Sequence, residues 1–152
     1  PPRSTLFPYT TLFRSAASLE WNFQRMLAKV NNKIHTDAIK ERLIPLRLTK
    51  AQMGVVYASE ADLLNVALFG MTAAHWRQAN PDQAGNMRDA ATLEQLVVLS
   101  NLESLNAVLI HQGMAASERL QQLNTIAITQ MQSLLGNPAL QQLPHAAEKK
   151  LT

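Results

Sequence analysis

The fold of this chain is decided by residues 92–112, which read TLEQLVVLSNLESLNAVLIHQ. Thr92 followed three residues later by Gln95 has the pattern of a capping box, which begins a helix, and Gly113 can take the left-handed conformation that ends one. Because successive residues turn by about 100°, the apolar side chains fall on three faces of this helix rather than on one. The three faces are Val98, Leu102, Leu105 and Leu109; Leu96, Leu99 and Ile110; and Leu93, Val97 and Val108. A helix that is apolar on nearly every side is expected to be buried.

This helix rises roughly 1.5 Å per residue and is therefore about 30 Å long, the width of a small domain. Glu94, Asn101, Glu103 and Asn106 interrupt it too often for a membrane span. Glu94 and Glu103 lie on opposite sides of the helix, so buried polar partners or helix-end contacts explain them better than joint action on one substrate. We predict an all-α fold, a compact multi-helix domain packed around this central buried helix, with an N-terminal amphipathic helix.

The composition agrees with this fold class and offers no chemistry. The 152 residues are enough for one domain, and 47% hydrophobic with 16% charged residues excludes wholesale disorder. The absence of Cys excludes disulfides and thiolate metal sites, and it is compatible with the cytoplasmic location that we expect. No phosphate-binding loop or nucleophile motif is present, and the four His residues lack the spacing of metal ligands. We therefore expect no enzyme activity, no cofactor and no metal.

The first fifteen residues are set aside. Residues 5–15 read TLFPYTTLFRS, in which TLF occurs twice without an amphipathic period. This segment resembles the conceptual translation of a widely used sequencing adapter, and it lacks the small-residue cleavage site of a signal peptide. We expect residues 1–15 to be an artefactual, disordered leader, residues 16–136 to form a single helical domain, and residues 137–152 to be a flexible tail. The natural N-terminus is then expected to be missing from a longer protein.

Helix punctuation divides the rest of the chain. Ser18 is expected to cap a helix over residues 19–34, and Pro45 to stop a second helical piece over residues 36–44. Thr49 with Gln52 forms another capping box. This box is expected to open a short helix that ends at Tyr57. Two more helices are expected over residues 60–69, ended by Gly70, and over residues 73–79, capped by Thr72. A last long helix is expected from a Ser117 cap to residue 135. The last of these is expected to turn Leu120, Leu123, Ile126, Met131 and Leu134 inward.

The helix over residues 19–34 carries two features. One face is apolar and is a candidate interface, formed by Leu19, Phe23, Met26, Leu27, Val30 and Ile34. Arg25, Lys29 and Lys33 follow one another at i+4 beside it. Residues 16–50 hold seven basic and three acidic residues, whereas residues 51–152 hold five and eight. The basic row indicates either a surface that faces phosphates or a partner, or the solvated side of a helix that packs elsewhere.

Residues 62–79 have the punctuation of a helix–turn–helix, since an apolar helix is followed by Gly70 and a second short helix. In a DNA-binding reading, His75, Arg77 and Gln78 would face a groove. The match is partial because the second helix is short and Glu60 and Asp62 repel phosphates. Any two helices joined by a Gly-Thr turn show the same pattern.

Four segments carry a family resemblance: LEWNFQRMLAKVNNKIHTDAIKERLIP, YASEADLLNVALFGMTAAHWRQANP, GNMRDAATLEQLVVLSNLESLNAVLI and ERLQQLNTIAITQM. Over residues 19–135 the chain resembles the region that follows the DNA-binding domain in KilA-N domain proteins of phages, prophages and bacteria. The resemblance implies a phage-type DNA-binding protein, a regulator or accessory factor. The KilA-N domain itself lies upstream in that family, so none of its DNA-contacting residues falls on a position of this chain.

Two functions follow as hypotheses. The first is a non-catalytic accessory domain of a KilA-N-type DNA-binding protein, in which Arg25, Lys29 and Lys33 contact backbone phosphates. The second is an oligomerisation or protein-interaction module, without DNA contact of its own, that docks through the apolar face of residues 19–34. The expected partners are therefore DNA, through the missing upstream domain or the basic helix, and a second copy of the chain. No membrane partner is expected.

Overall fold

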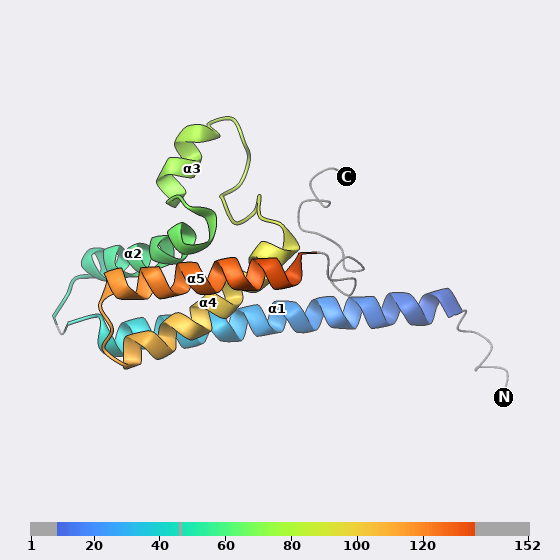
Figure 1. Ribbon diagram of the computed structural model, residues 1–152, viewed down its shortest axis with the longest axis horizontal. Coiled ribbons are helices and arrows are strands. Elements are labelled where there is room, and N and C mark those ends of the chain that lie inside the picture. The colour runs from blue at the N-terminus through green and yellow to red at the C-terminus, as the bar shows by residue number, and fades with distance from the viewer. Residues whose placement is uncertain (1–8, 46, 136–152) are drawn as a thin grey trace.

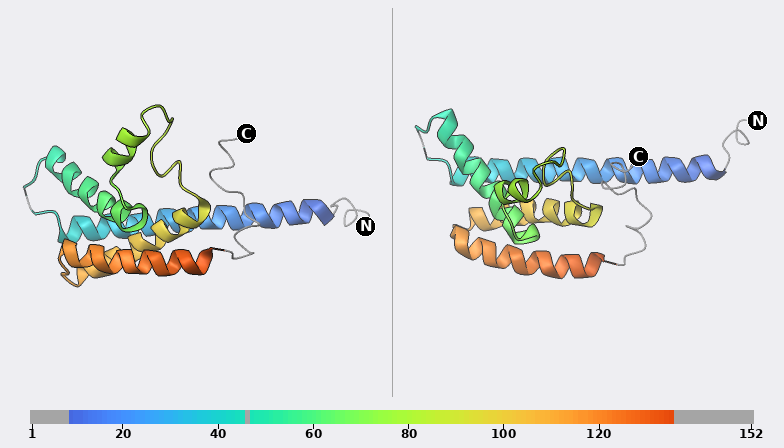
Figure 2. Two further views of the ribbon diagram at one scale, coloured as in Figure 1. Left: turned by 45° about the horizontal axis from the view of Figure 1, so that its top comes forward. Right: turned by 90° about the horizontal axis from the view of Figure 1, so that it is seen from above.

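The computed structural model describes residues 9–45 and 47–135, with side-chain burial from residue 18 onward. The described residues form five helices and no strand: α1 (Tyr9–Arg42), α2 (Lys50–Phe69), α3 (Ala73–Ala79), α4 (Leu93–His111) and α5 (Ala116–Leu134). The all-α prediction is confirmed. In Figures 1 and 2, α1, α4 and α5 run alongside one another, α2 crosses them at an angle, and α3 stands away on its connecting segments.

The ends of α2 and α4 lie where local chemistry places them. Both begin in full capping boxes, in which the Thr49 and Thr92 hydroxyls accept from backbone N–H groups at 3.2 Å. Gly70 ends α2 with φ +76°. At the other end of α4, Gly113 has φ +77° and the Met114 N–H bonds to the Leu109 carbonyl at 3.1 Å, which completes a Schellman motif.

Two predicted breaks are wrong, because the helices continue through them. α1 runs unbroken from residue 9 to residue 42, so neither the Ser18 cap nor the division near residue 35 exists. The Thr36 hydroxyl bonds to the Lys33 carbonyl at 3.1 Å and thereby stays within the helix. α1 also includes residues 9–15, which were expected to be disordered; the proposed tail, from residue 137 on, lies outside the described residues.

The two segments predicted from Thr49 to Tyr57 and over residues 60–69 are likewise one helix, α2, because residues 58 and 59 continue it without a break. The predicted Ser117 cap is also wrong. The helix cap lies two residues earlier, at Ala115, which makes no side-chain capping bond. The Ala115 backbone is extended (φ −65°, ψ 151°), so the chain enters the helix before Ser117.

α4 lies at the centre of the bundle. One apolar cluster joins α2, α4 and α5, and a second joins α1 to α4. The first consists of Leu64, Ala67, Val98, Leu99, Leu102, Leu123 and Ala127, and the second of Ala38, Ile39, Ala107 and Ile110. The predicted central helix is therefore confirmed, with one correction. Val108 was assigned to a buried face but is 51% exposed.

Other features of α4 and α1 bear on what the bundle presents to its surroundings. By length and mean hydropathy (1.3), α4 could cross a membrane, and half of it is buried among the other helices.

In Figures 1 and 2 the N-terminal part of α1 runs past the ends of α4 and α5. That part of α1 therefore has no helix of the bundle beside it.

Candidate functional site

The apolar face of α1 points away from the bundle. Leu19, Phe23 and Met26 are 69%, 57% and 60% exposed, and the same face continues with Leu27, Val30 and Ile34, which are 39–49% exposed. Further along α1, His35, Ala38 and Ile39 are buried against the other helices. All six predicted interface residues thus lie together on one exposed surface, called here the α1 apolar stripe.

The basic row lies beside this stripe. Arg25, Lys29 and Lys33 are all exposed on α1. Lys33 forms an ion pair with Asp37 one turn further on, at 3.1 Å, and both side chains are more than half exposed. Such a solvated pair contributes little to stability, about 0–1 kcal/mol, so the ammonium group remains accessible to another anion.

The three residues proposed for groove reading lie on α3 and are exposed, but one of them is already engaged. The Arg77 guanidinium donates to the carbonyls of Asn80 (3.2 Å), Gln83 (2.7 Å) and Gly85, and it lies 5.0 Å from the centre of the Trp76 ring. Arg77 therefore holds the segment after α3 in place. His75 and Gln78 flank it on a helix of only 7 residues, which leaves little side chain for base contacts.

A buried polar cluster joins four helices: His35 of α1, Glu60 of α2, Asn106 of α4 and Arg119 of α5. Arg119 donates from Nη1 and Nη2 to the two carboxylate oxygens of Glu60, at 2.6 and 2.9 Å, and from Nη1 also to Asn106 Oδ1 at 2.9 Å. Its Nε donates to the Met114 carbonyl at 3.0 Å. The Asn106 amide donates one hydrogen to Glu60, at 3.1 Å, and the other to His35 Nε2, at 2.8 Å.

This arrangement fixes the protonation of the cluster. Burial lowers the pKa of His35 to about 4; the Glu60 charge opposes this shift, and the Arg88 and Arg119 charges reinforce it. Neutral His35 can accept at Nε2, as the Asn106 contact requires. Burial alone would raise the pKa of Glu60, but hydrogen bonds from Arg119 and Asn106, with the Arg119 charge, lower it below its ordinary value. Glu60 is therefore a carboxylate and His35 is neutral near pH 7.

Glu103 of α4 is a second buried acid, 5% exposed. Its carboxylate lies 3.8 Å from the Arg88 guanidinium, beyond direct hydrogen-bond distance. Burial raises the pKa of Glu103, against smaller opposing effects of Asn32 and Arg88. Glu94 lies in the first turn of α4, so the two acids of this helix occupy a helix end and a buried position, and the helix-end contact expected for Glu94 stays a prediction.

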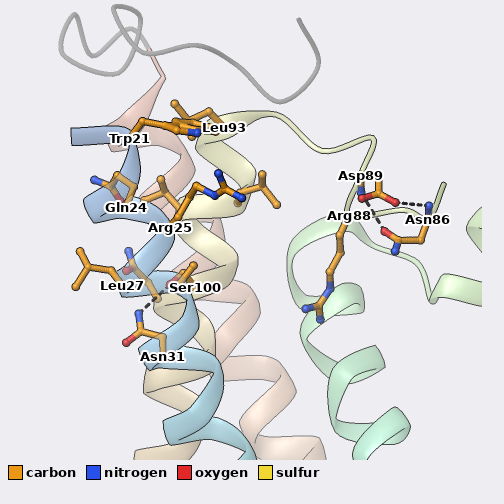
Figure 3. A pocket seen from close by; sticks show the side chains of 14 residues that line it. Trp21, Gln24, Arg25, Leu27, Asn31, Asn86, Arg88, Asp89, Leu93 and Ser100 are labelled. Atoms are coloured by element: carbon orange, nitrogen blue, oxygen red, sulfur yellow. Dashed lines mark hydrogen bonds between the residues drawn. The ribbon is translucent and has the colours of Figure 1, made fainter. Parts of the chain in front are cut away.

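A cavity of about 720 Å³ opens between α1, the first half of α4 and the segment before α4. Figure 3 shows Trp21 and Leu93 close together at one end, with Arg25 and Asn31 on the α1 side and Arg88 on the other. The Asn31 amide donates to the Ser100 hydroxyl at 2.8 Å and so joins α1 to α4 beside the cavity. No three His, Asp or Glu side chains of the described residues are grouped as metal ligands.

Sequence reasoning placed Arg25 on a basic row but not in a cavity, and it missed the whole buried cluster. A polar residue inside an apolar helix, such as Asn106, is the local signal that a partner exists. The identity of that partner depends on which helices become neighbours. Glu60 and Arg119 are 59 residues apart in sequence, and nothing local connects them.

A scan against protein-family models, a search of curated proteins and a search of solved structures each found no match. The resemblance to the region downstream of the KilA-N domain therefore stays a prediction that rests on the four sequence segments.

Removing the cation from the buried cluster should be severely destabilising. Arg119→Met leaves the Glu60 carboxylate buried without its donors, so we expect the free energy of unfolding to fall by about 3–5 kcal/mol. Urea unfolding followed by circular dichroism measures this. Lys33→Met, which breaks an exposed ion pair, is the matched control and should change it by less than about 1 kcal/mol. A small effect of Arg119→Met would contradict the cluster geometry.

The free energy of unfolding should decrease as the pH is lowered, because of His35. Its pKa is about 4 in the folded chain and about 6.5 in the unfolded chain, so between these values the unfolded state binds more protons. The contribution of His35 to the free energy of unfolding is therefore complete above pH 6.5 and decreases toward pH 4, by roughly 3 kcal/mol. The lowered pKa of Glu60 extends the loss of stability below pH 4.5, whereas the raised pKa of Glu103 opposes it.

The substitution His35→Gln tests this assignment, because the Gln carbonyl can accept from Asn106 without titrating. We expect urea unfolding between pH 6.5 and 4.5 to depend much less on pH in this variant. His75→Gln, on the exposed α3, should retain the dependence of the unsubstituted chain. Equal slopes in the His35→Gln variant and the unsubstituted chain would show that another group causes the change.

Proposed function

We propose that this chain is a non-catalytic helical module that self-associates through the α1 apolar stripe. The observation that carries the proposal is the exposure of six large apolar side chains on one face of one helix. Scattered apolar residues are normal on a protein surface, but a continuous patch of them is typical of an interaction site. No other described element covers this face.

A second copy of the chain is the partner that the geometry favours. The stripe spans an arc of about 100° on the helix, which is the width of an apolar face that packs against a neighbouring helix. The basic row lies to one side of this arc, so two stripes can meet without burying Lys29 or Arg25. A two-fold pairing of identical surfaces is the commonest form of protein self-association.

The buried cluster supports the non-catalytic part of the proposal. The titratable groups that lie close together, His35, Glu60 and Arg119, are each no more than 6% exposed and bond to one another or to Asn106. A general acid or base must reach the proton that it transfers. These groups stabilise the bundle and have no access to a substrate.

The resemblance to KilA-N proteins supports placing this module in a phage-type DNA-binding protein, as an accessory to an upstream DNA-binding domain. The exposed row of Arg25, Lys29 and Lys33 favours a weak phosphate contact of its own, because three cations on one side of a helix can follow a nucleic-acid backbone. Self-association and phosphate contact use adjacent sides of α1 and are compatible.

Charged substitutions within the apolar stripe should dissociate the proposed dimer into single chains. We expect light scattering to give a mass about twice the 16.8 kDa of one chain, and the double substitution Phe23→Glu with Val30→Glu to return it to one chain. The reason is that a carboxylate brought into an apolar interface must be desolvated without a partner. Circular dichroism should show that the variant is still helical.

Val55→Glu is the matched control, because Val55 is 69% exposed on α2 and lies outside the stripe. It should leave the mass unchanged. A chain that is monomeric at every concentration, or a control that dissociates the dimer as well as the stripe variant does, would contradict the proposed interface.

DNA contact through the basic row should be weak and sensitive to salt. Titration of a fluorescent duplex with the chain should show binding at low salt that disappears at high salt, because binding releases condensed counterions. Lys29→Gln together with Lys33→Gln should weaken binding and make its salt dependence shallower. In a plot of log affinity against log salt concentration, the slope should fall by about 0.9 for each phosphate that the variant no longer neutralises. No binding at low salt removes this function from the described residues.

A further inference from the structure

The cavity between α1 and α4 has the dimensions of a small-molecule site. Its volume of about 720 Å³ lies within the range of pockets that hold drug-sized ligands. The cavity and the apolar stripe share Leu27, but Phe23 and Val30 of the stripe do not line the cavity, so substitutions at these two residues test the surfaces separately.

One wall of the cavity is apolar. Trp21 and Leu27 contribute from α1, and Leu93, Leu96 and Val97 contribute from the first two turns of α4. Leu93 is 3% exposed and packs with Trp21 and Val97, so this wall has a fixed shape. A fixed apolar wall favours a rigid or extended hydrocarbon body.

The charged groups that line the cavity are Arg25, Arg88 and Asp89, which leaves a net positive charge. Asp89 is the acid of this set, and its carboxylate accepts from the Asn86 backbone N–H at 2.8 Å, which fixes it within its own turn. Arg88 has an acidic neighbour, Glu103, but at 3.8 Å. The positive end of the α4 dipole also lies at the cavity, through Leu93. The electrostatic environment therefore favours an anion.

We propose that the cavity binds an amphipathic anion, a carboxylate on an aliphatic or aromatic body. The body lies against Trp21 and the α4 wall, and the carboxylate is recognised by the Arg25 guanidinium, while Arg88, which faces Glu103, adds positive charge from the other side of the cavity. Guanidinium groups match a carboxylate through paired hydrogen bonds, which a neutral amide of the same shape cannot replace.

Decanoate, below its micelle concentration, is the probe, and decanamide is its uncharged counterpart. Trp76→Phe leaves Trp21 as the reporter, because the chain has two Trp residues. We expect decanoate to change the Trp21 emission with at least tenfold tighter binding than decanamide, since the amide cannot form the charge-assisted hydrogen bonds. Isothermal titration calorimetry gives the dissociation constants independently of the reporter.

Three substitutions locate the site. Arg25→Gln and Arg88→Gln should each weaken decanoate binding about tenfold and leave decanamide binding unchanged. Ala28→Phe, which adds a ring inside the cavity, should weaken the binding of both probes. Lys29→Gln, on the same helix but outside the lining, is the matched control and should weaken neither.

The stripe variant, Phe23→Glu with Val30→Glu, separates this site from the self-association surface. This variant should bind decanoate with an unchanged dissociation constant. If it lost decanoate binding, the probe would lie on the stripe, and the proposal would be overturned. The same conclusion follows if decanamide binds as tightly as decanoate, if neither arginine matters, or if decanoate does not bind. An acidic helical peptide that binds where decanoate fails would show a protein-docking groove instead.

Discussion

The bundle depends on one buried ion pair, between Glu60 and Arg119, and on the two neutral groups that complete it. Asn106 uses both amide hydrogens and its carbonyl within the cluster, so Glu60, Arg119 and His35 are all tied to α4. A buried charge without its partners is strongly destabilising. Sliding any one helix by a turn would break this set of contacts. The cluster therefore selects one register of the four helices. Apolar contacts specify a register less strictly, because one apolar side chain can replace another as a neighbour.

The register then determines which surfaces face outward. Because His35, Ala38 and Ile39 of α1 face α4, the side of the same helix that carries Phe23 and Val30 faces away. The apolar stripe is a geometric consequence of how α1 is held at its C-terminal end. The cavity follows from the same arrangement, since α1 and α4 are close near Ala107 and Ile110 but leave a space beside Leu96 and Val97.

The sequence predicted features of the fold that depend on neighbours a few residues apart. The capping boxes at Thr49 and Thr92 and the left-handed glycines at Gly70 and Gly113 are short-range signals, and the structure contains all of them. The break predicted in α1 near residue 35 was wrong because His35, Ala38 and Ile39 pack against the other helices, and tertiary packing overrides weak local signals. The apolar stripe was visible as a periodic face, but whether it packs inward or outward could not be read from periodicity.

The contrast between the two ends of α4 has a consequence for how the bundle opens. Near Met114, four helices share charged and amide contacts, whereas near Leu93 the Trp21 cluster and the Asn31–Ser100 bond hold α1 beside an open space. Local stability commonly varies in this way along a protein, and segments with fewer contacts exchange their amide hydrogens first. The part of α1 before Asn31 can unwind while the ion pair stays intact, and this part carries five of the six residues of the apolar stripe.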